Sequence, residues 1–122
     1  MTNKYVNKVT LQGNLGSDPI VRTSKKGDKF ITFSIATQIE YKKKDTDQKV
    51  KFVEWHNVVV YDAFLSLLAR GNFKKGDLIY IEGSLHNSSW EDKDGKTHQK
   101  TQIVVRNSQI HQIKKITSNY QE

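Results

Sequence analysis

The sequence predicts an all-β fold, a five-stranded Greek-key barrel with one α-helix between its third and fourth strands. Several runs are rich in β-branched and aromatic residues and alternate between apolar and polar positions, which is typical of half-buried strands. Only residues 63–70 carry apolar side chains at helical spacing. A length of 122 residues suits a single domain.

The expected strands are separated by turn signals. They cover residues 5–12, 20–23, 30–39, 50–61, 78–90, 99–105 and 108–116. Pro19 and the dipeptide Asp94-Gly95 mark two of the turns, and basic or charged loops at residues 24–29 and 41–49 mark two more. We expect Asp62 to cap the helix and Gly71 to end it.

Side-chain alternation assigns faces to the long strands. One face of residues 50–61 carries Lys51, Val53, Trp55, Asn57, Val59 and Tyr61, and the other carries Phe52, Glu54, His56, Val58 and Val60. The apolar face of residues 30–39 carries Ile31, Phe33, Ile35, Thr37 and Ile39, and that of residues 78–90 carries Ile79, Ile81, Gly83 and Leu85. The two tryptophans therefore share their faces with polar side chains.

Trp55 and Trp90 are the sharpest candidate binding residues. A single Trp in a strand is more often buried than not, so core packing is the alternative for Trp55. Trp90 lies on the polar face of its strand, at the base of a predicted hairpin. An exposed indole there is costly unless it contacts a partner, which favours binding.

A single helix between strands three and four is typical of the OB-fold, a Greek-key barrel that binds oligonucleotides on one sheet face and its flanking loops. Gly13 and Gly83 lie within the first and fourth barrel strands, where they would ease the coiling that closure demands. We therefore expect residues 1–116 to form one OB-fold domain of the kind that binds oligonucleotides, followed by a short tail at residues 117–122.

The charge balance indicates a polyanionic partner. Twenty Lys and Arg against thirteen Asp and Glu give a net charge of +7, which favours nucleic acid first and an acidic membrane surface second. The polar start of the chain and the lack of a long apolar run predict no membrane insertion. We expect a cytoplasmic protein without disulfides, since cysteine is absent.

No motif supports catalysis, a metal or a cofactor. The sequence Gly13–Gly16 lacks the Lys-Ser/Thr and the helix of a phosphate-binding loop. Residues 92–95 start like a calcium loop but lack its distal Glu. The four histidines have neither metal-ligand spacing nor a nucleophile partner. We expect a protein that is not an enzyme.

Three ordered motifs carry a resemblance to a known family. They are Asn7-Lys8-Val9-Thr10-Leu11-Gln12-Gly13-Asn14-Leu15-Gly16-Ser17-Asp18-Pro19 with Arg22, then Glu54-Trp55-His56-Asn57-Val58-Val59-Val60-Tyr61, and then Lys75-Gly76-Asp77-Leu78-Ile79-Tyr80-Ile81-Glu82-Gly83-Ser84-Leu85 with Trp90 and Asp94-Gly95. Together they cover about residues 5–105, and they closely resemble the bacterial single-stranded-DNA-binding proteins.

The resemblance implies an OB-fold homotetramer that protects single-stranded DNA, without sequence preference, during replication, recombination and repair. The aromatic residues implied to stack on bases are Tyr41, Trp55, Tyr61 and Trp90, and the basic residues implied to contact DNA are Lys8, Arg22, Lys43, Lys74 and Lys75. His56 would support subunit association.

The sequence departs from the family pattern in three places. Tyr41 and Tyr61 replace other aromatic residues, and both keep a π-face. Residues 86–89 include none of the basic residues often found there, and Asn57 stands in place of a basic residue. The acidic tip that in this family recruits replication and repair proteins does not follow residue 116, so we expect either a truncated chain or a member without that recruiting function. Two alternatives stay open: a primosome-type OB-fold accessory protein, which would be a dimer acting through protein contacts, and an enzyme such as a nuclease.

Overall fold

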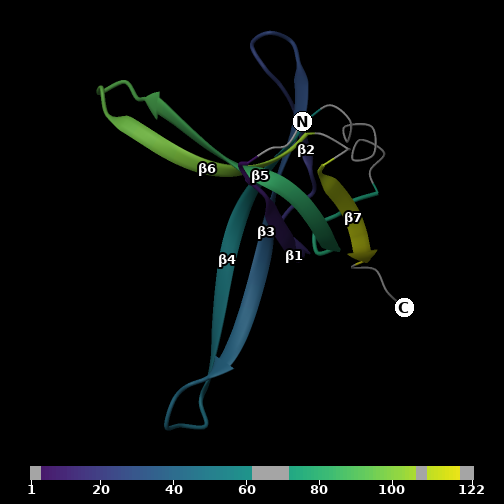
Figure 1. Cartoon of the computed structure of the whole chain (residues 1–122), viewed down its shortest axis with the longest axis vertical. Coiled ribbons are helices and arrows are strands. Elements are labelled where there is room, and N and C mark those ends of the chain that lie inside the picture. The colour runs from purple at the N-terminus through teal and green to yellow at the C-terminus, as the bar shows by residue number, and fades with distance from the viewer. Residues whose placement is uncertain (1–3, 62–71, 107–109, 119–122) are drawn as a thin grey trace.

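The structure of the chain is a computed structural model that describes residues 4–61, 72–106 and 110–118 (Figure 1). The strands in this part of the chain are β1 Val9–Leu15, β2 Ile20–Thr23, β3 Lys29–Lys42, β4 Lys49–Val60, β5 Leu78–Glu91, β6 Thr97–Val105 and β7 Gln112–Thr117. The helix predicted at residues 63–70 lies outside the described residues.

Five strands close into a barrel, in the order β1-β3-β4-β6-β5, because β5 pairs back with β1. The barrel pairings are antiparallel except β4 with β6, which is parallel. β2 extends the sheet from β3, and β7 extends it from β5. The predicted all-β, five-stranded barrel is confirmed.

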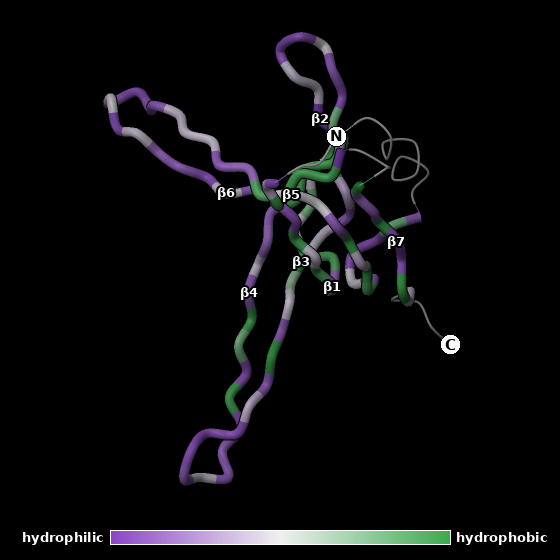
Figure 2. The backbone as a smooth tube through the Cα atoms, viewed as in Figure 1, coloured by the Kyte–Doolittle hydropathy of each residue, from purple (hydrophilic) through white to green (hydrophobic). Residues whose placement is uncertain are grey.

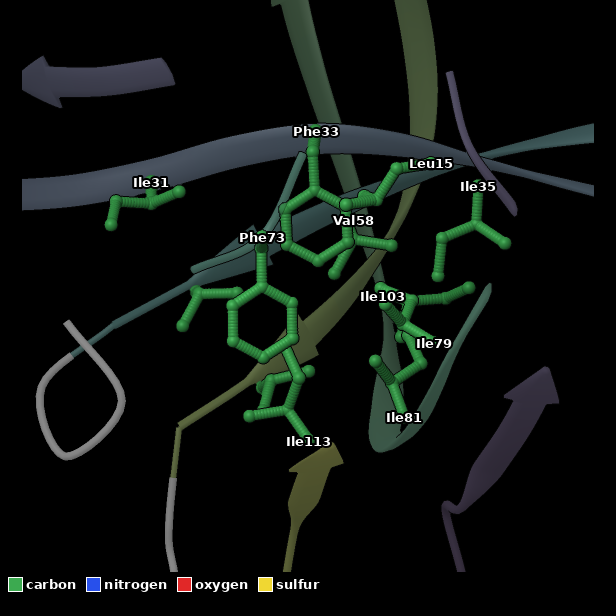
Figure 3. Packing of buried hydrophobic residues seen from close by; sticks show 12 residues of the cluster. Leu15, Ile31, Phe33, Ile35, Val58, Phe73, Ile79, Ile81, Ile103 and Ile113 are labelled. Atoms are coloured by element: carbon green, nitrogen blue, oxygen red, sulfur yellow. The ribbon is translucent and has the colours of Figure 1, made fainter. Parts of the chain in front are cut away.

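The barrel core is formed by inward-facing side chains of β1, β3, β4, β5, β6 and β7, together with Phe73 from the segment before β5 (Figure 3). Its buried side chains are Leu15, Ile31, Phe33, Ile35, Val58, Val60, Phe73, Ile79, Ile81, Ile103, Val105 and Ile113. The alternation predicted for residues 30–39 and 78–90 is confirmed inside the barrel. Further along the two strands the alternation wrongly predicts burial, since Ile39 is 63% and Leu85 50% exposed. Ile39 lies where its strand has left the barrel, and Leu85 lies at the barrel rim, beyond Gly83, the last β5 residue that pairs with β1.

Two long hairpins project from the barrel, as Figure 1 shows. We call residues 37–54 the β3–β4 arm, where the two strands pair only with each other, and residues 86–102 the β5–β6 arm. In Figure 2 the tube is hydrophobic mainly at the barrel, while polar segments prevail along the β5–β6 arm and at the tip of the β3–β4 arm. Each arm continues the sheet of the barrel outward into solvent.

Gly13 lies inside β1, as predicted, so the strand continues past residue 12, where its expected bounds ended. β1 begins at Val9 and runs through Gly13 to Leu15, pairing first with β5 and then, at Asn14 and Leu15, with β3. A Cβ at position 13 would lie 2.3 Å from the carbonyl oxygen of Ala36. The missing side chain therefore permits a close approach of backbones where β1 changes its partner.

An ion pair links the turn before β5 to β7. Asp77 is fully buried, and its Oδ2 accepts the Lys74 backbone N–H at 2.9 Å. The same oxygen lies 3.3 Å from Nζ of Lys115 on β7. A buried carboxylate needs such partners because the free-energy cost of removing its charge from water is otherwise not offset. β7 begins at Gln112 rather than at the predicted residue 108, and residues 107–109 lie outside the described residues.

Candidate nucleic-acid interface

Trp55 lies at the base of the β3–β4 arm, on the outer face of the sheet. It is 61% exposed, so packing in the core does not hold it there. Its backbone pairs with Ala36 on β3. A Cβ at Gly16 would lie 2.4 Å from Cζ3 of the indole and 2.6 Å from Oγ of Ser34. Gly16 therefore leaves the space in which the ring lies against the sheet.

A groove runs from this point across β2, β3 and β4 to the base of the β5–β6 arm. It has a volume of about 360 Å³ and is lined by Ser17, Ile20, Arg22, Phe30, Thr32, Phe33, Ser34, Asn57, Val58, Lys100 and Gln102. We call it the outer groove. Arg22 is oriented by a hydrogen bond from its Nε to Oγ1 of Thr32, at 2.9 Å. These described lining residues include two cations and no carboxylate, so the groove attracts anions.

Trp90 lies near the end of the β5–β6 arm and is 50% exposed. The His98 imidazole stacks on it, with ring centroids 5.3 Å apart and planes 22° apart. Nε2 of His98 lies 2.7 Å from Oδ2 of Asp92. That hydrogen bond, followed by one from the Lys96 backbone N–H, holds the pKa of the Asp92 carboxyl below its usual range.

Tyr61 directly follows the last residue of β4. It lies beside Phe30, at the end of the outer groove away from Trp55. Its ring centroid lies 5.8 Å from that of Phe30, which lines the groove, and the Arg106 guanidinium lies over the ring at 4.7 Å. Arg106 donates its backbone N–H to Nδ1 of His111 at 2.9 Å. Burial lowers the pKa of His111, and the Arg106 charge lowers it further. The Tyr61 ring is thus already covered by a cation on one side.

These exposed aromatic rings, beside a cationic groove on a small barrel, are typical of a surface that binds single strands. Residues 6–111 match the model of the family described as the single-strand binding protein family. The chain belongs to this family.

Relatives and a solved structure agree with the match. The chain is 40% identical over 106 residues to "Single-stranded DNA-binding protein 1" of Xylella fastidiosa, which covers 86% of this chain and 76% of that protein. It is 38% identical over 102 residues to the "Single-stranded DNA-binding protein" of Rickettsia typhi, covering 84% and 67%. A solved Plasmodium falciparum SSB in complex with ssDNA superposes with a TM-score of 0.78 at 30% identity, covering 95% of this chain and 99% of that one.

In this family member the structure separates Tyr41 from Trp55. Residues paired directly across two antiparallel strands point to the same side. Ala36 pairs with Trp55 on the outer face, whereas Ile39 pairs with Phe52 and Tyr41 with Val50 on the other face of the β3–β4 arm. Tyr41 is 50% exposed and lies beside Ile39 and Phe52 around an open hollow of about 390 Å³. The two predicted stacking residues thus lie on opposite sides of one ribbon.

The predicted basic residues are spread around the molecule. Lys43 lies in the loop at the tip of the β3–β4 arm, where its backbone N–H donates to the Gln48 carbonyl at 2.8 Å. Lys74 and Lys75 lie in the turn before β5, and the Lys75 backbone N–H donates to Oδ1 of Asp18 at 2.7 Å. Among the five predicted cations, Arg22 lines the outer groove.

Lys8 lies on another side of the barrel, where β1 pairs with β5. Its Nζ is 3.6 Å from Oε1 of Glu82. Tyr80 donates its hydroxyl hydrogen to Oε2 of the same carboxylate. These contacts, first the one with Tyr80 and then the one with Lys8, lower the pKa of Glu82, and the Glu82 acceptor raises the pKa of Tyr80. Lys8 already has an anionic partner within the chain.

His56 lies on the face of β4 opposite Trp55. Its Nε2 forms a 2.8 Å hydrogen bond with Oγ1 of Thr37 across the β3–β4 pair. The ring is half-buried and leans toward the inner side of the sheet. Its predicted role in subunit association stays a prediction.

Sequence reasoning missed four residues of this region: Lys100 and Gln102 in the outer groove, Arg106 over Tyr61, and His98 on Trp90. All four lie on β6 or just after it. The Asp94-Gly95 turn could have revealed His98, because folding the hairpin about that turn brings residue 98 opposite Trp90. Lys100, Gln102 and Arg106 needed the parallel pairing of β6 with β4, which has no local signature.

The part of the chain that the structure describes contains neither a metal site nor a membrane-spanning helix. Within the described ranges, no three His, Asp or Glu side chains gather closely enough to hold a metal ion. No helix in those ranges has the length and apolar character to cross a bilayer.

Proposed function

We propose that this protein binds single-stranded DNA without sequence specificity, by stacking bases on exposed aromatic rings and by contacting phosphates with Lys and Arg. One observation carries the proposal: Trp55, held against Gly16, lies beside a groove whose charged lining residues, Arg22 and Lys100, are both cations. Stacking is tolerant of sequence because every base has a π-face. The names of the relatives and the solved complex with ssDNA support the same function.

The proposed site has a centre and a periphery. Trp55 and Arg22 form the centre, and Trp90 lies on the β5–β6 arm, whose base carries Lys100 and Gln102. Tyr41, Tyr61, Lys8, Lys43, Lys74 and Lys75 complete the proposed set. Of these, Tyr61 would contact DNA together with Arg106, which lies over its ring. A phosphate that contacts Lys8 would compete with the ion pair between Lys8 and Glu82.

We expect binding to depend strongly on salt. Each phosphate contact to a single strand contributes about 0.7 to the slope of log K against log salt concentration, because counterions are released. If about four of the proposed cations contact phosphates, the slope is roughly −3. Fluorescence titration with oligo-dT at several NaCl concentrations measures it, and a flat series would rule out the phosphate contacts.

The proposed biological role requires binding of single strands and no catalysis. We propose that the protein is not an enzyme and that it protects single strands during DNA replication, recombination and repair, in the cytoplasm at the nucleoid. Labelled single strands should stay intact when they are incubated with the protein and Mg²⁺. Specific cleavage would instead indicate a nuclease.

We further propose that the protein is a homotetramer, with His56 near a subunit contact. The proposal rests on the family resemblance and on the exposed apolar side chains of the part of the chain that the structure describes, such as Ile39 and Phe52. Light scattering should give four times the 14.1 kDa chain mass. A dimer would favour an accessory protein of the primosome type.

A further inference from the structure

Two carboxamide side chains lie next to each other where the two arms separate. Val58 on β4 pairs in parallel with Ile103 on β6, and both belong to the buried core. The residue before each of them therefore points to the outer face, because side chains alternate along a strand. These two residues are Asn57 and Gln102, and both line the outer groove. We call them the amide pair, and it lies at the foot of the two arms, which leave the barrel in different directions (Figure 1).

On β4 the outer face continues from the amide pair to Trp55. Trp55 precedes Asn57 by two residues, so the two side chains point to the same side of the strand. Ser34 on β3 pairs with Asn57 and also lines the groove. A base stacked on Trp55 would therefore lie next to the Asn57 carboxamide.

On β6 the outer face continues from the amide pair toward Trp90. The row of outward side chains runs from Gln102 through Lys100 to His98, which pairs with Trp90. His86 pairs with Gln102, so its imidazole lies on the same face of the β5–β6 arm. The direct path of a single strand between the two tryptophans crosses the amide pair.

Both carboxamides are available to a ligand. Within the described ranges, neither the Asn57 nor the Gln102 side chain forms a hydrogen bond with another residue. A carboxamide has an oxygen that accepts and an NH2 group that donates. The edge of an unpaired base offers both donors and acceptors, whereas a phosphate offers acceptors only. A carboxamide can therefore use both of its groups on a base but only one on a phosphate.

We propose that Asn57 and Gln102 hydrogen-bond to the edge of a base that lies between the two tryptophans, while Lys100 contacts a neighbouring phosphate. This proposal rests on the proposed function. Asn57 stands in place of a basic residue of the family pattern, so a charged contact is replaced at this position by a contact with a base. Each of the four bases carries at least one donor and one acceptor, so binding stays tolerant of sequence.

The first test changes the ligand and leaves the protein intact. Two oligonucleotides of equal length are compared: oligo-dT, and the same strand with every thymine replaced by difluorotoluene. That isostere keeps the shape and the stacking face of thymine but has no strong hydrogen-bonding group. The measured quantity is the ratio of Kd for the isostere strand to Kd for oligo-dT, obtained by fluorescence titration at one salt concentration.

The second half of the test removes the amide pair. In the double variant Asn57→Ala/Gln102→Ala this ratio should be about two- to ten-fold smaller than in the wild type, which is the range of one net hydrogen bond. The matched control is Gln99→Ala, which removes an exposed carboxamide from the same strand. Gln99 pairs with Ser89 and points to the other face of the arm, so its variant should keep the wild-type ratio.

Equal ratios in the wild type and the double variant would overturn the proposal, because the amides would then contact phosphates or no part of the strand. A Gln99→Ala ratio as low as that of the double variant would overturn it too. Either result leaves the proposed function intact as long as the wild type binds oligo-dT. A wild-type protein that does not bind oligo-dT would instead contradict the proposed function.

A charged substitution tests the same position from the opposite direction. Asn57→Lys exchanges the carboxamide for a cation, which adds one phosphate contact. The slope of log K against log salt concentration should therefore steepen by about 0.7, and the isostere ratio should fall toward that of the double variant. An unchanged slope would place position 57 away from the bound strand, and an unchanged ratio would show that Asn57 contacts no base. Each of these results would overturn the proposal.

Discussion

Replacing Trp55 with alanine should weaken oligo-dT binding by about 1–3 kcal/mol, which is roughly five- to 150-fold in Kd. The indole is 61% exposed and lies on the outer face of the sheet, so its loss removes a stacking surface and leaves no cavity in the barrel. Fluorescence anisotropy of labelled oligo-dT measures the affinity, and circular dichroism checks that the fold is unchanged. Wild-type affinity in this variant would remove Trp55 from the site.

Two further variants separate the ring from its placement. Trp55→Phe keeps an aromatic face and should lose less affinity than Trp55→Ala. Gly16→Val keeps the indole but places side-chain atoms where a Cβ alone would lie 2.4 Å from the ring. The indole must then move, and binding should weaken although Trp55 is present. Normal binding by Gly16→Val would show that the position of the ring against Gly16 does not matter.

Replacing Gly13 with alanine should lower the free energy of unfolding by about 1–3 kcal/mol, the usual cost of overpacking. The new Cβ would lie 2.3 Å from the Ala36 carbonyl oxygen and 2.7 Å from Cγ2 of Ile35, so β1 or β3 must shift. Urea denaturation followed by circular dichroism gives the change in free energy.

The control for Gly13→Ala is its neighbour on the same strand. Gln12 is exposed on the outer face, and Gln12→Ala should change stability by less than about 0.5 kcal/mol. If Gly13→Ala is as stable as the wild type, the close approach of β1 to β3 is not a constraint on the fold. Saturating oligo-dT should stabilise both variants, because the ligand binds only the folded protein.

The barrel could be predicted because its strands obey a local rule. Side chains alternate along Ile31, Phe33 and Ile35 and along Ile79 and Ile81, and all five are buried. The same rule failed at Ile39, since alternation identifies a face but not the point at which a strand leaves the barrel. That point depends on where β1 and β6 stop pairing with β3 and β4, which is a non-local property.

The candidate site was predicted in part for the same reason. Trp55 and Trp90 were recognisable because each shares its face with polar side chains, and both are exposed. Tyr41 was grouped with Trp55, yet the register of β3 with β4 places it on the opposite face of the arm. Arg106 reaches Tyr61 only through the parallel pairing of β6 with β4. Such a contact joins residues far apart in the chain and leaves no periodic trace.

The most direct test of the central claim compares two ligands of equal length and equal phosphate charge: oligo-dT and an oligonucleotide in which every nucleotide is abasic. The intact protein is titrated with each at the same salt concentration while tryptophan fluorescence is recorded. If bases stack on the exposed indoles, oligo-dT should quench the fluorescence and bind more tightly, by about 1–3 kcal/mol for each base stacked. Equal affinities with no difference in quenching would show that charge alone drives binding and would contradict base stacking on Trp55 and Trp90.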